Sequence, residues 1–160
     1  MEFDRVVLPE RRSVVRQYIG PRQGFARATQ SLYAWVGTYF SYRVGEVTVC
    51  YSKRPKSLSA PSPKERIRAE ARFDVDDDFA REVSLPHDLS LIQVPREEIL
   101  FHFFVGKLDD LRAEAIPWMK AAEEIEPLVA GFRQRIIRMP EGKSPSDEGW
   151  EVETQLVVAP

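Results

Sequence analysis

The chain has 160 residues, 43% of them hydrophobic, so it is long and apolar enough to bury the core of one domain. Its 23 basic and 25 acidic residues give a formal net charge of -2, which argues against a surface built as a whole to bind nucleic acid. One cysteine excludes an internal disulfide framework and a multi-cysteine zinc site, and two histidines leave little material for a histidine-based metal site. No apolar run approaches the roughly 20 residues of a membrane helix, and no signal-peptide core is present, so we expect a cytoplasmic protein.

The first half of the chain is predicted to place one helix among three strands. Residues 12–19 are rich in β-formers without helical spacing, and a Gly-Pro pair ends this strand. Apolar residues then recur at steps of three and four over residues 25–39, which predicts a helix. Alternation of apolar with polar residues predicts strands at residues 47–51 and 66–73, separated by a proline-rich loop.

The second half repeats the order strand–helix–strand–strand. Residues 98–105 form an almost wholly apolar strand, and residues 108–125 carry apolar side chains at helical spacing. Two final strands are predicted at residues 133–139 and 150–158. Because each half alone would expose one face of a three-stranded sheet, we expect the halves to pair. The predicted fold is α+β, with an antiparallel sheet, two helices on one side and a central groove.

Short sequence elements also show the duplication. Tyr18-Ile19-Gly20 precedes the first predicted helix, and Phe104-Val105-Gly106 precedes the second. The apolar face of each helix includes a tryptophan, although the distance from glycine to tryptophan differs by about one helical turn. A groove between two such halves is a natural ligand site. We therefore expect a single domain over residues 1–160, with structural repeats at about 12–78 and 90–160.

Several segments are informative through their common order and spacing: residues 13–21, 32–36, 49–51 with Pro55, 67–70, Pro117-Trp118 and 150–153. In this order they resemble the DNA-gyrase-inhibitor-like (GyrI-like) family, over nearly the full length from residue 13 to 160. The same fold forms the effector-binding domain of multidrug-sensing bacterial transcription regulators. The resemblance implies a groove that binds small, often aromatic and cationic molecules. It also implies two other activities, hydrolysis of strained cyclopropane compounds and protection against toxins or gyrase poisons.

One position departs from the family pattern. Relatives typically place a glutamate that reaches into the groove on the strand after the second helix. Here Arg133 stands at that position, or Gln134 if the register slips by one residue. The stretch around residues 52–56 is basic where relatives often carry acids. A cation site built on that glutamate is therefore not predicted.

Aromatic residues offer one set of candidate ligand contacts, since tryptophan and tyrosine combine flat apolar area with a polar edge. For Trp35 the alternative is a core position on the helix face. Pro117 removes a backbone donor and is expected to kink the second helix beside Trp118. The aromatic candidates are Tyr18, Trp35, Tyr51, Phe101 and Trp118.

Charged residues offer the second set. Arg133 and Arg135 share one face of their strand, and Glu151 and Glu153 share one face of the last strand. If these strands form a hairpin, the four side chains make a cross-strand ladder. The alternative is a groove for an acidic ligand, in which arginine binds carboxylate or phosphate. In either case Glu153 is the surviving acidic group, with Arg133 as its expected partner.

The remaining candidates have ordinary interpretations. Seven basic residues between positions 53 and 72 could contact nucleic acid, but without aromatic interleaving or a helix-turn-helix we interpret them as a solvated face. His102 is interpreted as a hydrogen-bonded histidine and Cys50 as an inert thiol. No metal, cofactor or catalytic residue is predicted.

The leading hypothesis is a standalone, non-enzymatic domain that binds a small aromatic or amphipathic molecule between the two halves, under the two helices. A second hypothesis is a hydrolase for a strained electrophile, with Glu153 and Tyr51 as the acid–base candidates. A third is an inhibitor that binds DNA gyrase, or a regulator protein, through the loop at residues 53–64. The predicted domain consumes almost the whole chain, so no direct DNA binding and no membrane partner are expected.

Overall fold

Eight strands form one antiparallel sheet, which the computed structural model describes over residues 3–39, 47–51, 64–82, 84–125, 129–142 and 144–159. Their order across the sheet is β1-β6-β8-β7-β3-β4-β2-β5. The strands are β1 (Asp4–Leu8), β2 (Arg11–Pro21), β3 (Val47–Tyr51), β4 (Arg66–Val75), β5 (Ser90–Val94), β6 (Glu97–Gly106), β7 (Val129–Arg138) and β8 (Trp150–Val158). The helices are α1 (Phe25–Ala28), α2 (Gln30–Tyr39), α3 (Asp77–Glu82) and α4 (Leu111–Ile125).

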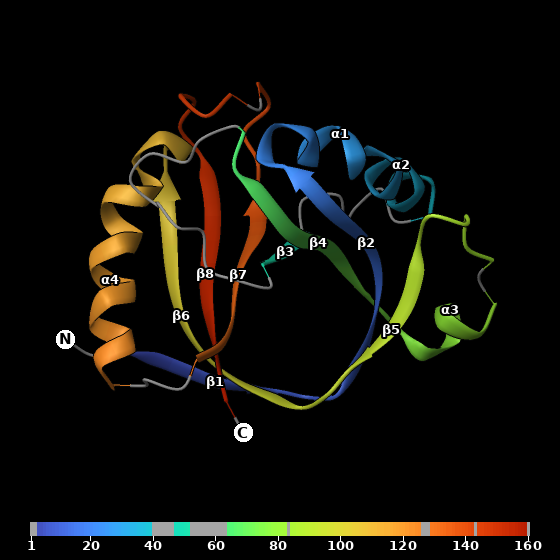
Figure 1. Cartoon of the computed structure of the whole chain (residues 1–160), viewed down its shortest axis with the longest axis horizontal. Coiled ribbons are helices and arrows are strands. Elements are labelled where there is room, and N and C mark those ends of the chain that lie inside the picture. Colours follow the sequence, from blue (N-terminus) through green and yellow to red (C-terminus); the bar gives the residue numbers. More distant parts are fainter. Residues whose placement is uncertain are drawn as a thin grey trace.

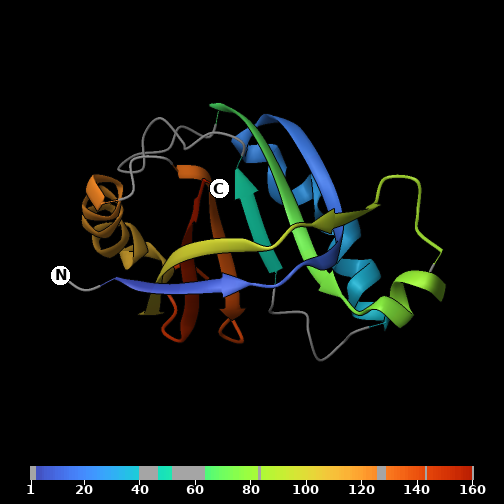
Figure 2. The same ribbon diagram turned by 90° about the horizontal axis from the view of Figure 1, so that it is seen from below.

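The two halves of the sheet have the same internal order, and β3 pairs with β7 where they meet. Strands β2, β3 and β4 with α1 and α2 form one half, and β6, β7 and β8 with α4 form the other. Each half also receives a strand from the other, because β1 leads into β2 but pairs with β6, while β5 leads into β6 but pairs with β2. Figure 2 shows these blue and yellow segments crossing the near side of the molecule. The α+β class and the antiparallel sheet are confirmed.

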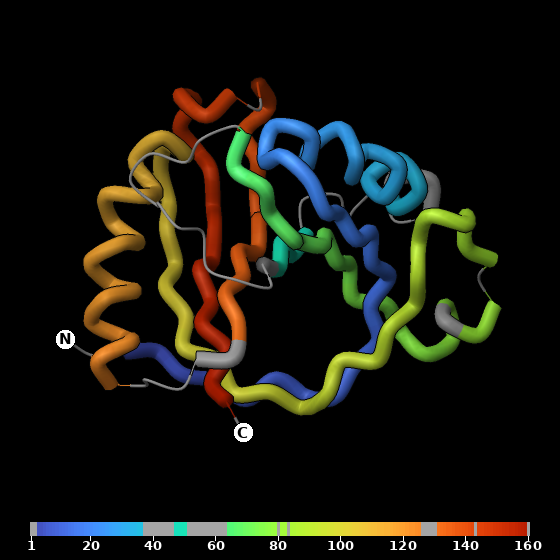
Figure 3. Tube along the Cα trace, in the orientation of Figure 1, coloured from blue at the N-terminus to red at the C-terminus, as the bar shows by residue number. Residues whose placement is uncertain are grey.

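The sheet is strongly curved, and α1, α2 and α4 lie on its outer side (Figures 1 and 3). The residues of β4 alternate between exposed and buried positions, as the sequence predicts, with Ile67, Ala71 and Phe73 buried. Residues directly opposite in neighbouring strands point to the same face, so this alternation fixes the face of every strand. We call the side covered by the helices the helix face and the opposite side the concave face.

Two groups of buried side chains on the helix face form most of the core. Helix α2 packs with Leu32, Trp35 and Val36 on β2, β3 and β4. Helix α4 packs on β6, β7 and β8 through the second group, which consists of Leu100, Trp118, Met119, Ala122, Phe132 and Leu156. Full burial of such a side chain contributes roughly 1.5–3 kcal/mol, so the helix face supplies most of the apolar stabilisation.

The repeated aromatic-x-glycine elements have a packing explanation. A Cβ built on Gly20 would lie 2.8 Å from the hydroxyl oxygen of Tyr18, and one on Gly106 would lie 3.2 Å from Cζ of Phe104. Each ring therefore folds back over the glycine two residues later, at the end of its strand. A larger residue at either glycine would force the ring to move, so the motif serves local packing in both halves.

Three elements were not predicted: β1, β5 and the short helix α3. In α3, Asp76 caps the helix by accepting a hydrogen bond from the backbone N–H of Phe79 at 2.7 Å. The predicted first helix is divided at Thr29, whose hydroxyl donates to the carbonyl oxygen of Phe25 at 2.9 Å. Helix α4 continues through Pro117 as one element. No described helix has the length and apolar character needed to cross a membrane.

Candidate functional site

A cavity of about 510 Å³ opens on the concave face, so the predicted groove exists on the side of the sheet away from the helices. The expectation that the helices cover it was wrong, because α2 and α4 pack on the other face. Strands from both halves contribute to its wall. The lining residues are Gln17, Tyr18, Ile19, Cys50, Arg68, Ala69, Glu70, Arg72, Glu97, Gly131, Phe132, Arg133 and Val157.

A single row of paired residues crosses the sheet through the cavity. Gln17 of β2 lies opposite Glu70 of β4, and Glu70 lies opposite Cys50 of β3. Cys50 in turn lies opposite Arg133 of β7, which lies opposite Gln155 of β8. The antiparallel register thus places an acid, a thiol and a guanidinium side by side at the boundary between the halves.

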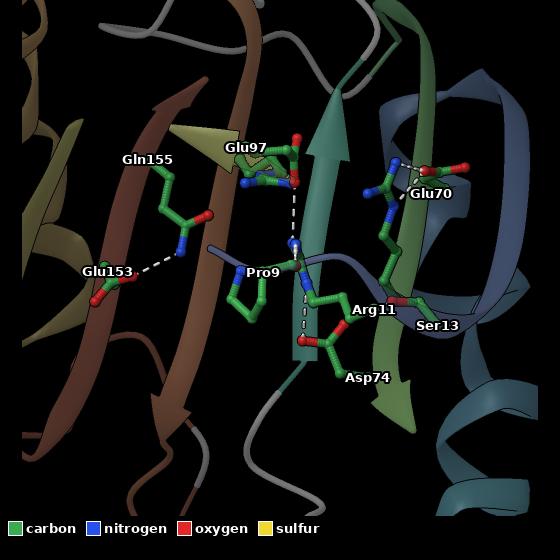
Figure 4. Close-up of polar contacts among 10 residues, drawn as sticks. Pro9, Arg11, Ser13, Glu70, Asp74, Glu97, Glu153 and Gln155 are labelled. Atoms are coloured by element: carbon green, nitrogen blue, oxygen red, sulfur yellow. Dashed lines mark hydrogen bonds and ion pairs between the residues drawn. The ribbon is translucent and has the colours of Figure 1, made fainter. Parts of the chain in front are cut away.

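Glu97 enters the site from the start of β6, in the segment that crosses between the halves. Its carboxylate accepts hydrogen bonds from Nη1 of Arg133 and from Nη2 of Arg11, both at 3.0 Å. Arg11 also lies 3.3 Å from the carboxylate of Asp74, measured from its Nε. Figure 4 shows Arg11 between Glu97 and Asp74. One carboxylate therefore shares its charge between two guanidinium groups, which holds the crossing segment against β7.

A second ion pair occupies the other side of the cavity. Arg72 and Glu70 lie two residues apart on β4, so both point to the concave face. The Nε and Nη2 atoms of Arg72 both contact Oε1 of Glu70. The two carboxylates of the cavity wall, Glu70 and Glu97, are therefore each engaged by arginine.

Arg133 is the most deeply buried charged residue of the site, with 3% of its surface exposed. Its Nη1 contacts both carboxylate oxygens of Glu97, at 3.0 and 3.3 Å. Its Nε and Nη2 are buried and have no hydrogen-bond partner among the described residues. A buried N–H group without a partner is uncommon and calls for an explanation.

Cys50 lies at the centre of this row and is buried. Burial raises the pKa of its thiol to about 11, while Arg72 and Arg133 lower it and Glu70 and Glu97 raise it. The thiol is therefore protonated at neutral pH and a weak nucleophile, as the interpretation of an inert cysteine requires.

The predicted site residues separate into three groups. Arg133 lines the cavity; Tyr18 is also among the lining residues, but its ring belongs to the helix face, where it packs against Phe25 of α1. Trp35 and Trp118 are buried in the two core groups of the helix face, so the alternative core interpretation fits Trp35. Phe101 and Glu153 belong to the concave side of the sheet but lie outside the cavity wall. The side chain of Tyr51 and residues 52–63 lie outside the described residues.

The predicted charge ladder forms with different partners. Arg135 lies opposite Glu153, with 3.6 Å between Nη2 and Oε2. The expected pair of Arg133 with Glu153 was wrong, because Arg133 lies opposite Gln155 and binds Glu97. In addition to its pair with Arg135, Glu153 accepts a hydrogen bond from the side chain of Gln155 at 2.6 Å.

Sequence reasoning missed the acids of the cavity. Glu70 could have been found, because it belongs to the strict alternation of β4 that places it with Arg68 and Arg72 on the polar face. Glu97 has no such signal, because it reaches the site through the exchange of β1 and β5 between the halves. Within the described residues, no group of histidine, cysteine, aspartate and glutamate could hold a metal ion.

Comparison with known proteins shows the fold. No protein-family model matches the sequence, and no curated protein does. A hydrolase from Listeria innocua superposes with a TM-score of 0.68 at 16% identity, over 99% of this chain and 92% of that one. The EcmrR C-terminal domain gives 0.64 at 14% identity, over 99% of both chains. SAV2435 bound to tetraphenylphosphonium gives 0.60 at 12% identity, over 99% of this chain and 94% of that one.

Proposed function

We propose that this chain binds a small molecule in the cavity of the concave face. The observation that carries the proposal is the cavity itself, whose volume of about 510 Å³ falls in the usual range for ligand sites, roughly 300–1,000 Å³. Its wall combines apolar side chains, among them Ile19 and Val157, with charged groups held by ion pairs. Such a wall suits a small aromatic or amphipathic molecule.

The fold neighbours support the same function. We propose in addition that the chain belongs to the GyrI-like family. One neighbour is the C-terminal domain of EcmrR, and another was solved with tetraphenylphosphonium, a small aromatic ion. A domain of this architecture, which carries its cavity between two similar halves, suits the capture of an effector, drug or toxin. We therefore propose a binding domain of the GyrI-like type.

Calorimetric titration with a panel of planar and amphipathic compounds tests this function. Tryptophan fluorescence is a poor reporter, because Trp35 and Trp118 lie behind the sheet. Gly131 lines the cavity, and a Cβ there would make ordinary contacts with Cγ2 and Cβ of Val157, at 3.6 and 3.7 Å. Gly131→Leu should therefore fill the cavity without a backbone clash and weaken binding at least about tenfold. Val105→Leu, on the same face but outside the wall, is the control; equal binding by both variants would contradict the proposal.

A hydrolase is the second candidate, because the cavity contains two carboxylates that could position water or donate a proton. Glu70 and Glu97 replace Glu153 as the candidates, since Glu153 lies outside the wall. Chromatography of cyclopropane-containing esters or amides after incubation would detect turnover, and Glu97→Gln or Glu70→Gln should abolish it. Turnover unaffected by both variants would remove this candidate. The proposed contact with DNA gyrase or a regulator protein stays a prediction, because its loop lies outside the described residues.

A further inference from the structure

We propose that the ligand of this cavity is an organic anion whose carboxylate binds the free edge of Arg133. The inference rests on the proposed binding function and names the class of molecule that the cavity takes. It differs from the cationic molecules that the resemblance to the GyrI-like family implies, and it selects the acidic ligand that the sequence left open as an alternative. Three observations carry it: the geometry of Arg133, the guanidinium groups of the wall and the engagement of both acids.

The geometry of Arg133 is specific for a two-oxygen partner. Glu97 occupies Nη1, while Nε and Nη2 have no partner among the described residues. The Nε–H and one Nη2–H lie on the same edge of the planar guanidinium and point in parallel. Two parallel N–H groups match the two oxygens of a carboxylate, the arrangement in which arginine binds acids most selectively.

Other arginines do not share this arrangement. Arg16, Arg22 and Arg135 each leave only Nε buried and unpartnered among the described residues. Arg133 alone in this group has two such nitrogens, and it alone lines the cavity. Both nitrogens are covered, so Arg133 must turn this edge toward the cavity to meet an anion. Because a buried charged donor without a partner is strongly disfavoured, the anion then supplies the hydrogen bonds that this edge lacks.

The composition of the wall points the same way. Its described residues include three guanidinium groups, those of Arg68, Arg72 and Arg133. A wall rich in guanidinium groups favours an anion over a cation.

Among the described lining residues, both acids are already engaged by arginine. Arg72 engages Glu70 through two nitrogens, and Arg11 with Arg133 engages Glu97. A cationic ligand would have to break one of these pairs and leave a guanidinium without its counter-charge in a partly buried site. The apolar part of the ligand would contact Ile19, of which 61% is exposed, and Val157 on the opposite half.

Three probes with the same aromatic body test the inference by calorimetry: 2-naphthoate, 2-naphthamide and 2-naphthylmethylammonium. The wild-type protein should bind naphthoate at least about tenfold more tightly than the other two. Arg133→Gln should weaken naphthoate about 10- to 100-fold and leave naphthamide unchanged. Arg133→Lys, which keeps the charge but loses the two-nitrogen edge, should fail to restore wild-type affinity. The control is Arg135→Gln, on the same face of β7 but outside the wall, which should bind naphthoate normally.

The outcomes separate the inference from the function on which it rests. Equal or tighter binding of the amide or the ammonium would overturn the anionic ligand and leave the binding function in place. Binding of none of the three at millimolar concentration would contradict both. The ranking of probes by the wild-type protein needs no variant, so it decides the question even if Arg133→Gln folds poorly. The double variant Arg133→Gln/Glu97→Gln removes both charges of the pair and leaves no unpaired carboxylate. It is a second test of the preference for naphthoate if the single variant folds poorly.

Discussion

The two faces of the sheet differ in what their residues do. On the helix face, side chains such as Phe73 and Leu156 are buried against helices and contribute apolar area. On the concave face, the corresponding alternate positions carry arginine and glutamate, arranged in pairs around a cavity. The same strands therefore supply stability on one side and a candidate binding surface on the other.

This difference between the faces explains the position of the buried guanidinium of Arg133. Arg133 follows Phe132 on β7, so one residue belongs to the core of the helix face and the next to the concave face. The guanidinium is nevertheless as buried as the core, because the crossing segment with Glu97 closes over it. The free energy of unfolding should thus depend on the volume of the buried side chains on the helix face, and on intact ion pairs on the concave face.

Leu100→Ala should have the largest effect on stability. Leu100 is fully buried beneath α4, and truncation of such a residue costs about 2–5 kcal/mol through lost contacts and a residual cavity. Ile19→Ala on the concave face should cost no more than about 0.5 kcal/mol, because Ile19 is mostly exposed. Urea denaturation measures both. Similar losses for the two variants would remove the distinction between the faces.

Glu97→Ala should be the most harmful change on the concave face, at about 3 kcal/mol. Removal of this carboxylate leaves Arg133 buried without its counter-charge and takes one partner from Arg11. Glu98→Ala is a matched control, because the neighbouring glutamate pairs with Arg5 at the surface and should contribute no more than about 1 kcal/mol. If thermal and urea unfolding give the two variants equal stability, the ion pairs of Glu97 stabilise the fold no more than the surface pair of Glu98 does.

Strongly patterned elements are the ones that sequence reasoning predicts well. The last strand was predicted at residues 150–158, as observed, because its apolar and polar residues alternate. The duplicated order of strands and helices was also found. Strands β1 and β5 were missed because they are short and become strands by pairing with the long strand of the other half. Such an exchange is a property of the tertiary fold and has no local sequence signal.

The candidate site was predicted only in part for a related reason. Periodicity identifies Trp35 and Trp118 as residues of an apolar helix face, but it does not say on which side of the sheet the cavity opens. Arg133 was identified because it departs from a family pattern. Its partner Glu97 depends on how the chain crosses between the halves, and it lies 36 positions away in the sequence.

Alkaline pH should affect the concave face before the helix face. The pKa of Cys50 is raised from 9.0 to about 11 in the folded chain, so the native thiol holds its proton more tightly than the unfolded one. Its contribution is complete below about pH 9 and is lost as the pH rises to about 11, with about 1 kcal/mol lost at pH 10. Cys50→Ala should lack this loss when unfolding is followed from pH 8 to 10.

Tyr33 provides the comparison on the helix face. Burial raises its pKa from 10.0 to about 12, so its contribution is lost only between about pH 10 and 12. Cys50→Ala should leave this later decrease unchanged. A wild-type stability that stays constant from pH 8 to 10 would contradict the assignment of the earlier step to Cys50.

The smallest expected effect concerns the pair of Arg135 and Glu153. These residues lie directly opposite on β7 and β8, but the Arg135 side chain is 43% exposed, so water screens the pair. A double-mutant cycle with Arg135→Gln and Glu153→Gln should give a coupling energy of about 0.2–1 kcal/mol. The coupling should weaken in 1 M NaCl, unlike the buried pair of Arg133 with Glu97. A coupling above about 2 kcal/mol would mean that the ladder is closed off from solvent, and that the protected region of the concave face extends beyond the cavity wall.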